Sequence, residues 1–163
     1  MMNFTSAGKR VGLVLALAGL TASYAATAAD GPFDDAIKAR QAMFQIYGFN
    51  TGLLGAMAKE KIPYDAEVAA EAAANLNAAA NFGQSQMWPP GSDNATEGNA
   101  TNRALPALWE TYPAAVEKGD ALKEAAAAMA AVAGDGLGAL QGAMGDLGAS
   151  CKGCHDDFRA EKK

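Results

Sequence analysis

The stretch LGALQGAMGDLGASCKGCHDDF, residues 137–158, has the clearest pattern in the chain. Its large apolar and sulfur-containing residues follow one another in alternating steps of three and four: Leu137, Leu140, Met144, Leu147, Cys151, Cys154 and Phe158. Such steps return side chains to one face of an α-helix, and a seven-residue repeat lets that face pack against another helix. We therefore expect a helix over about 137–161. It is too short for a free coiled coil and suits one helix of a bundle.

Three further segments have helical spacing, over about 32–60, 65–82 and 103–133. Their apolar stripes are Phe33, Ile37, Phe44, Tyr47, Leu54 and Ala58 in the first, Val68, Ala72, Leu76 and Ala79 in the second, and Leu122, Met129 and Val132 in the third.

The boundaries of these segments follow from proline and glycine. Pro63 ends the first helix because proline cannot continue the hydrogen-bond ladder, and Pro113 should kink or divide the third. Gly83 is expected to cap the second helix. Residues 83–102, rich in Gly, Pro and Asn, form the one long loop. The sequence thus predicts an all-α, antiparallel four-helix bundle.

Composition limits the chemistry. The chain has 163 residues, which is one domain's length, with two Cys and a single His. These numbers exclude a four-ligand Cys/His zinc site within one chain, and also a second histidine ligand to any metal. A formal charge of −5 without a basic cluster argues against nucleic-acid binding.

The first thirty residues have the layout of a secretory signal peptide. Lys9 and Arg10 precede a short apolar run, residues 11–20, and small residues follow at 25–29. We expect cleavage after Ala28 or Ala29, which leaves residues 30–163 as the mature domain. The apolar run is too short to span a bilayer comfortably, so no membrane insertion is expected after processing. A bacterial periplasm fits best.

Residues 151–155, Cys-Lys-Gly-Cys-His, form the C-x-x-C-H pattern of c-type haem attachment. Two thiols one helical turn apart can form thioethers with the two vinyl groups, and the imidazole of His155 then serves as an axial iron ligand. A zinc site lacks ligands, and a thioredoxin-type dithiol expects a βαβ context. A disulfide between Cys151 and Cys154 would be strained. One covalent haem c is therefore the predicted cofactor.

The whole of residues 30–163 resembles cytochrome c′, the class II c-type cytochromes. The matching stretches are Ala39-Arg40-Gln41, Ile62-Pro63-Tyr64-Asp65, Pro106-Ala107-Leu108-Trp109 and the long run of residues 146–159 around the cysteines. The resemblance implies a C-terminal covalent haem in a four-helix bundle. It also implies a homodimer with the first two helices at the interface.

The resemblance also implies roles for individual residues. Cys151 and Cys154 would carry the thioethers, and His155 would be the proximal ligand. Arg40 and Gln41 would lie against the haem edge, where an arginine can pair with a propionate. Arg159 would sit near the proximal pocket, and Asn102 and Arg103 fall where the family has further edge contacts.

The residue on the other side of the iron decides the mechanism. Class II chains place either a methionine or an apolar side chain there, and this distal position falls four residues after Arg40, at Phe44. Phenylalanine cannot ligate iron, and Met43 is turned by about 100° on a helix. We therefore expect five-coordinate, high-spin iron that favours nitric oxide or carbon monoxide over dioxygen. In the family, nitric oxide can finally bind on the proximal face after it displaces the histidine, and Arg159 would then be its neighbour.

The predicted function is that of a periplasmic haem protein, not an enzyme, that binds these gases and carries one electron to or from an unidentified redox partner. Nitric oxide scavenging, electron transfer, or both could be its role. The main alternative is a six-coordinate His/Met electron carrier that uses Met43 after a change of helix register. A peroxidase would have only Arg40 as a distal acid-base group, and a haem-free dithiol oxidoreductase is the last alternative.

Overall fold

The computed structural model describes residues 31–162, and the predicted signal peptide lies outside this part of the chain. Its helices are α1 (Asp34–Ala58), α2 (Ala66–Ala80), the short 3₁₀ helix η1 (Ser85–Met87), α3 (Ala107–Glu110), α4 (Tyr112–Val132) and α5 (Leu137–Phe158). The predicted all-α class is confirmed. Within residues 31–162 the only β-type pairing is an isolated antiparallel bridge between Ala104 and Arg159.

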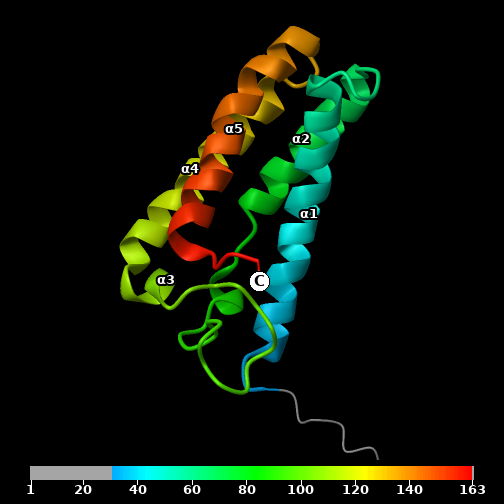
Figure 1. Cartoon of the computed structure of the whole chain (residues 1–163). Helices are drawn as coiled ribbons and strands as arrows, with labels where there is room; N and C mark the ends of the chain where they lie inside the picture. Colours follow the sequence, from blue (N-terminus) through cyan, green and yellow to red (C-terminus); the bar gives the residue numbers. More distant parts are fainter. Residues whose placement is uncertain (1–30, 163) are drawn as a thin grey trace, which may run out of the picture.

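The four long helices run alternately up and down the bundle (Figure 1). α1 lies beside α2, α2 beside α4, and α4 beside α5, whereas α1 and α5 meet only sparsely. Short turns join α1 to α2 and α4 to α5 at one end, which we call the turn end. The long connection between α2 and α3 crosses the opposite end, the loop end, where α5 also finishes. This is the predicted antiparallel four-helix bundle.

Proline divides the third predicted helix into two, as expected. Pro113 lies in the first turn of α4, where its missing N–H is not needed, and Thr111 separates α4 from the single turn of α3. The prediction that helix begins at Arg103 is wrong. The backbone there is extended because Ala104 pairs with Arg159, and the N–H of Leu105 donates to the carbonyl oxygen of Phe158 at 3.0 Å.

The same pairing shortens α5. We predicted helix to about Glu161, but α5 ends at Phe158 and Arg159 is extended, with φ −122° and ψ 119°. The predicted cap at Gly83 is also wrong. α2 ends at Ala80, and its C-terminal cap is Asn81, whose side-chain amide donates to the carbonyl of Asn77 at 2.9 Å.

The core lies along the inner faces of the long helices. Its largest fully buried side chains are Ile37, Leu54, Met57, Leu76, Met129, Leu140 and Leu147. Many of the remaining positions are alanines, which let α1, α2, α4 and α5 approach closely. Val68 and Phe44, two residues of the predicted stripes, are exposed and not in the core, at 40% and 43%.

The turn end is locked by tyrosine and aspartate side chains. Asp65 caps α2 by accepting hydrogen bonds from the N–H groups of Glu67 and Val68 at 3.0 and 3.1 Å. The hydroxyl of Tyr64 donates to the carbonyl of Ala133 at 2.8 Å and accepts from the N–H of Gly136 at 3.0 Å. These bonds tie the start of α2 to the α4–α5 turn.

None of the helices within residues 31–162 is long and apolar enough to cross a membrane.

Candidate functional site

The two cysteines and the histidine lie on the last two turns of α5. Both thiols are free and partly buried. Burial raises the pKa of Cys151 and of Cys154, and hydrogen bonding to Ser150 in the first case and the charge of Lys118 in the second oppose the shift. A reactive dithiol needs a lowered thiol pKa, so this environment is unlike that of a thioredoxin-type redox pair.

His155 is next to these thiols and is also partly buried. Burial lowers the pKa of its imidazole, and the positive charges of Arg159 and Arg103 lower it further, against the opposite effect of Asp156. A guanidinium nitrogen of Arg159 lies 3.3 Å from His155 Nε2. These surroundings favour the neutral imidazole, which is the form that binds metal ions.

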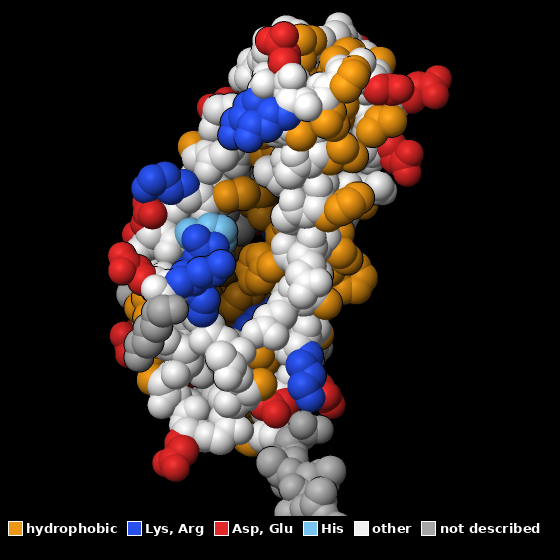
Figure 2. All heavy atoms as spheres, turned by 45° about the vertical axis from the view of Figure 1, so that its right-hand side comes forward, with side chains coloured by type: hydrophobic (Ala, Val, Ile, Leu, Met, Phe, Trp, Pro, Cys, Tyr) orange, Lys and Arg blue, Asp and Glu red, His pale blue; other side chains and the backbone are white. Residues whose placement is uncertain are grey.

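A hollow separates α1 from α5 beside this histidine (Figure 2). Hydrophobic side chains line its interior, the pale blue side chain of the single histidine lies on its wall, and basic side chains gather at its rim. The sparse contact between α1 and α5 has the same cause, since the two helices are held apart here.

The segment 101–104 brings the predicted edge residues to the loop end. The side-chain amide of Gln41 donates to the carbonyl of Thr101 at 2.9 Å. Asn102 accepts from Arg40 at 3.3 Å and from the backbone N–H of Ala104 at 3.0 Å. The structure therefore joins Arg40 directly to Asn102.

Arg103 and Arg159 belong to a second cluster at the end of α5. Arg103 Nε donates to the carbonyl of Ala160 at 2.6 Å, and its own carbonyl accepts from the N–H of Ala160 at 2.9 Å. With the bridge between Ala104 and Arg159, these bonds hold Arg103, Arg159 and His155 together.

Arg40 has the most unusual environment of the predicted site residues. Its residue surface is only 2% exposed, although arginine is seldom buried. Its guanidinium donates to Ser92 Oγ at 2.6 Å, to the Ser92 carbonyl, and to the Met87 carbonyl at 3.2 Å. Burial lowers the pKa of Arg40 to about 10, and the nearby charge of Asp93 opposes this shift.

Two tryptophans complete this arginine pocket, and the sequence reasoning missed the contact. The Arg40 guanidinium carbon lies 4.6 Å from the ring centroid of Trp88 and 5.9 Å from that of Trp109, within reach of cation–π attraction. The chain has only these two tryptophans. Their scarcity was the one available signal, since nothing in the spacing of residues 83–109 places them beside Arg40.

Phe44 lies one helical turn after Arg40 and joins the same aromatic group. Its ring meets Tyr47 and Trp88 edge to face, with centroids 5.7 and 6.0 Å apart. Met43, its neighbour in the chain, is half-buried and packs against the helical core. The structure thus separates these two side chains, as the helical geometry of α1 predicts.

The residues present fit a covalently held haem. Two thiols and a neutral imidazole sit at the wall of an apolar hollow, and guanidinium groups at its rim can receive carboxylates. Among residues 31–162 no three His, Cys, Asp or Glu side chains come together as a group that could hold a metal ion.

Comparison with known proteins identifies relatives over most of the chain. Residues 35–159 match the family model described as cytochrome C′. Cytochrome c-554 of Cereibacter sphaeroides is 45% identical over 123 residues, covering 76% of this chain and 91% of that protein. Cytochrome c′ of the same species is 37% identical over 155 residues, covering 94% and 99%. The solved structure of cytochrome c′ from Rhodobacter Spheriodes has a TM-score of 0.75 at 34% identity, covering 78% and 97%.

Two further solved structures carry information on ligands and assembly. Cytochrome c′ of Alcaligenes xylosoxidans, seen as a ferrous variant with bound nitric oxide, has a TM-score of 0.66 at 27% identity and covers 78% of this chain and 95% of its own. Another cytochrome c′, described by an unusual ligand-controlled dimer dissociation, has a TM-score of 0.71 at 30% identity, covering 78% and 96%. With the site geometry, these matches show that the chain belongs to the cytochrome c′ family, whose members bind one covalent haem c.

Proposed function

We propose that this protein is an exported haem protein with five-coordinate, high-spin iron that binds nitric oxide or carbon monoxide. The bound haem supplies the iron that ligates diatomic gases and gains or loses one electron. The observation that carries the proposal is the apolar Phe44 at the predicted distal position of α1, one turn after the buried Arg40.

The attachment side of the proposed site consists of three α5 residues. Cys151 and Cys154 would form the thioethers, and His155 would be the axial ligand, consistent with its favoured neutral state. Arg159, 3.3 Å from His155 Nε2, would orient the imidazole and border a ligand on that face.

The opposite side is proposed to have no protein ligand. Four of the five methionines of the described residues have other surroundings: Met57 and Met129 are almost fully buried in the core, Met43 packs against it, and Met144 lines a separate hollow nearer the turn end. The fifth, Met87, lies in η1, and its backbone carbonyl accepts a hydrogen bond from Arg40 at 3.2 Å. An apolar ring such as Phe44 provides no hydrogen-bond donor, which disfavours dioxygen relative to uncharged nitric oxide or carbon monoxide.

The haem edge is proposed to lie at the loop end. Among the described residues, Arg40 donates hydrogen bonds only to neutral groups, and Asp93 acts on it through its charge. Its guanidinium therefore has no carboxylate among these residues as a hydrogen-bond acceptor, and a propionate would supply one. Gln41, Asn102 and Arg103 would border the same edge, since segment 101–104 connects them to Arg40 and to the end of α5.

Export and dimer formation belong to the same proposal. Residues 1–29 would be removed as a signal peptide, and residues 30–163 would act in the periplasm with a redox partner still to be identified. The first two helices expose large apolar side chains, among them Phe49 of α1 at 71% and Val68 of α2 at 40%. Such exposed groups fit a homodimer through α1 and α2, and a related cytochrome c′ is known for its dimer.

An absorption spectrum of periplasmically expressed protein tests the central proposal. We expect high-spin bands in both oxidation states and a shift on adding carbon monoxide to the reduced protein. Phe44→Met should give a low-spin spectrum, because a thioether would then face the iron. Phe49→Met, on the exposed face of the same helix, is the matched control and should leave the spectrum unchanged.

The same spectrum distinguishes the five-coordinate proposal from the six-coordinate His/Met alternative. That alternative requires Met43 to leave its place against the core and ligate the iron. Sharp low-spin bands that carbon monoxide does not shift, and that Met43→Leu converts to high-spin, would overturn the five-coordinate proposal. A colourless protein whose mass equals the processed polypeptide would overturn the haem assignment in this chain.

A further inference from the structure

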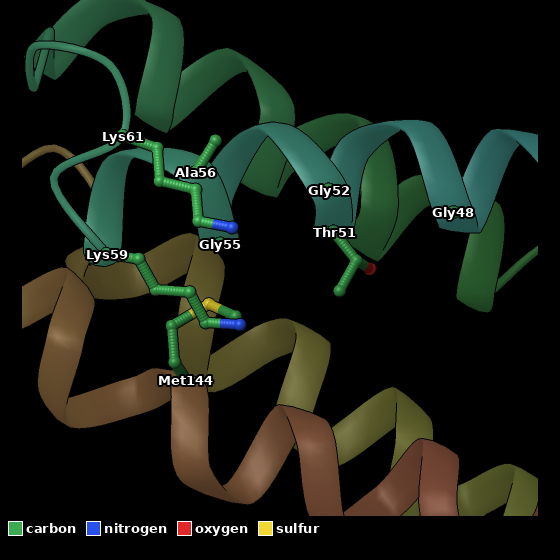
Figure 3. Close-up of a pocket in the computed structure, with 8 residues that line it drawn as sticks. All are labelled: Gly48, Thr51, Gly52, Gly55, Ala56, Lys59, Lys61 and Met144. Carbon is green, nitrogen blue, oxygen red and sulfur yellow. The ribbon is translucent and has the colours of Figure 1, made fainter.

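A second hollow lies between α1 and α5, nearer the turn end than Phe44 (Figure 3). It has a volume of about 480 Å³, which is within the usual range for small-molecule sites. The face of α1 from Gly48 to Ala56 forms one wall, Met144 of α5 forms the other, and Lys59 and Lys61 of the turn after α1 lie at one end.

The long walls of this hollow are apolar and spacious. Gly48 and Gly52 lie in the interior of α1, where glycine weakens a helix, yet a Cβ at either position would have nothing within 4 Å. Packing within residues 31–162 therefore does not require these glycines. At Gly55 a Cβ would be 3.5 Å from the methyl carbon of Met144, so the hollow narrows there.

One end of the hollow carries two positive charges. Lys59 and Lys61 extend from the turn after α1 toward the same space, one past Met144 and the other along α1 (Figure 3). The backbone of that turn is fixed, since the N–H of Lys59 donates to the Gly55 carbonyl at 3.1 Å and that of Lys61 to the Ala56 carbonyl at 2.9 Å. Glu60, between the two lysines, has a backbone φ of 54°, a value that residues other than glycine rarely adopt.

Lys59 and Lys61 place unpaired positive charge on a protein whose net charge is negative. The chain has 18 acidic and 13 basic residues, and no ion pair of Lys59 or Lys61 is found within the described part. By contrast, Lys118 and Lys123 have carboxylate partners at 3.0 and 2.8 Å. Two unpaired ammonium groups at the end of an apolar hollow select a ligand that is anionic at one end and apolar along its length.

We propose that this hollow binds a carboxylate that bears an unbranched alkyl tail. The carboxylate lies between Lys59 and Lys61, and the tail runs along Gly55, Gly52 and Gly48. The eleven residue steps from Gly48 to Lys59 span roughly 16 Å of helix, enough for a medium-length chain. A bare anion such as phosphate would leave the apolar walls uncovered. This site is independent of the proposed gas-binding function.

Calorimetric titration of the haem-loaded protein with decanoate tests this site. We expect decanoate to bind, decyltrimethylammonium to bind at least tenfold more weakly because its charge is reversed, and propanoate not to bind detectably. Replacing both lysines (Lys59→Gln with Lys61→Gln) should weaken decanoate binding about tenfold, since an exposed ion pair contributes up to a factor of about five. Lys123→Gln, on α4, should have no effect.

A second variant tests the location. A Cβ at Gly52 would have nothing within 4 Å, so Gly52→Leu directs a side chain into this open space. We expect circular dichroism to show an intact helix while decanoate binding is lost. Equal affinity for decanoate and decyltrimethylammonium would overturn the proposal, as would unchanged binding by Gly52→Leu. Loss of dimer in sedimentation of Gly52→Leu would also overturn it, because the hollow would then be covered by a second copy.

Discussion

The turn end and the loop end of the bundle are built from the same four helices but are filled differently. At the turn end, Leu54, Met57, Met129 and Leu140 are each no more than 1% exposed, and alanines bring the helices together. At the loop end, Phe44 is 43% exposed, and α1 stands away from the cysteine-bearing turns of α5 (Figure 2). The core of the turn end is filled by the chain's own side chains, whereas the loop end leaves an apolar hollow open beside the single histidine.

The largest expected effect is at the loop end. The double variant Cys151→Ser with Cys154→Ser should yield protein without covalently bound haem, because both thioethers are lost. Denaturing electrophoresis with haem staining measures this directly. We also expect hydrogen-exchange protection to fall in the last turns of α5 and the first half of α1 and to persist around Leu140. Uniform loss of protection would show that the two ends do not differ.

Leu140→Ala, at the turn end, should lower the stability of the protein and leave the haem site unchanged. Leu140 is fully buried, so truncation should lower the free energy of unfolding by about 2–5 kcal/mol. Denaturant unfolding gives this value, and the haem absorption spectrum should stay that of the parent protein. A changed spectrum with unchanged stability would contradict the distinction between the ends.

Arg40→Ala should destabilise the loop end by about 2 kcal/mol, because Ser92 loses its hydrogen-bond partner and two tryptophans lose a packed cation. Tryptophan fluorescence should shift with it, since both tryptophans lie beside Arg40. Arg40→Lys is the control. It keeps the charge but not the several simultaneous bonds, and should recover only part of the loss. Wild-type stability in Arg40→Ala would show that the arginine pocket is not structural.

Tyr47 ties α1 to the end of α2 and makes stability depend on alkaline pH. Its hydroxyl donates to the Ala79 carbonyl at 3.0 Å and accepts from Gln84 at 2.6 Å. Burial raises the pKa of Tyr47 above its ordinary value of 10.0, so the folded state holds this proton more tightly than the unfolded state. Stability should therefore fall as the pH rises above 10.

Tyr47→Phe tests this pH dependence. It should cost about 1 kcal/mol at neutral pH and should lose stability less steeply above pH 10 than the parent protein. Denaturant unfolding at several pH values measures both quantities. Parallel pH profiles for the two proteins would rule out Tyr47 as the titrating group.

The smallest expected effect is a gain at the turn end. Glu60 has a φ of 54°, so Glu60→Gly should stabilise the protein by about 1 kcal/mol through relief of backbone strain. Glu60→Ala is the matched control, because it removes the charge but keeps the strained backbone. If both variants stabilise equally in thermal unfolding, repulsion between charges and not the backbone would be the cause.

Prediction from the sequence worked best where the determining physics is local. The seven-residue repeat of 137–158 placed α5 correctly at its start, and Pro113 divided the third segment as expected. The helix ends at Arg103 and Glu161 were wrong for a shared reason. These two segments, more than fifty residues apart in the chain, pair with each other through Ala104 and Arg159, and no local pattern reports such a pairing.

Part of the candidate site could likewise be predicted from the sequence, and part could not. The C-x-x-C-H pattern came from spacing within one helix, the exclusion of zinc came from the numbers of Cys and His, and the distal position of Phe44 came from the family resemblance. The burial of Arg40 beside Trp88 and Trp109 could not be predicted, because the long loop carries one tryptophan and α3 the other. The hollow beside Lys59 and Lys61 was also absent from the prediction, since it exists only where α1 and α5 stand apart.

The sequence by itself determined the helical class, the order of the four long helices and the chemistry of the attachment residues. These depend on periodicity, proline placement and the spacing of two thiols and an imidazole along one helix. Only the tertiary structure decided which end of the bundle stays open, where α5 stops and what surrounds Arg40. Those features depend on contacts between distant segments, whose free energy comes from burial and hydrogen bonding that no single segment can form alone.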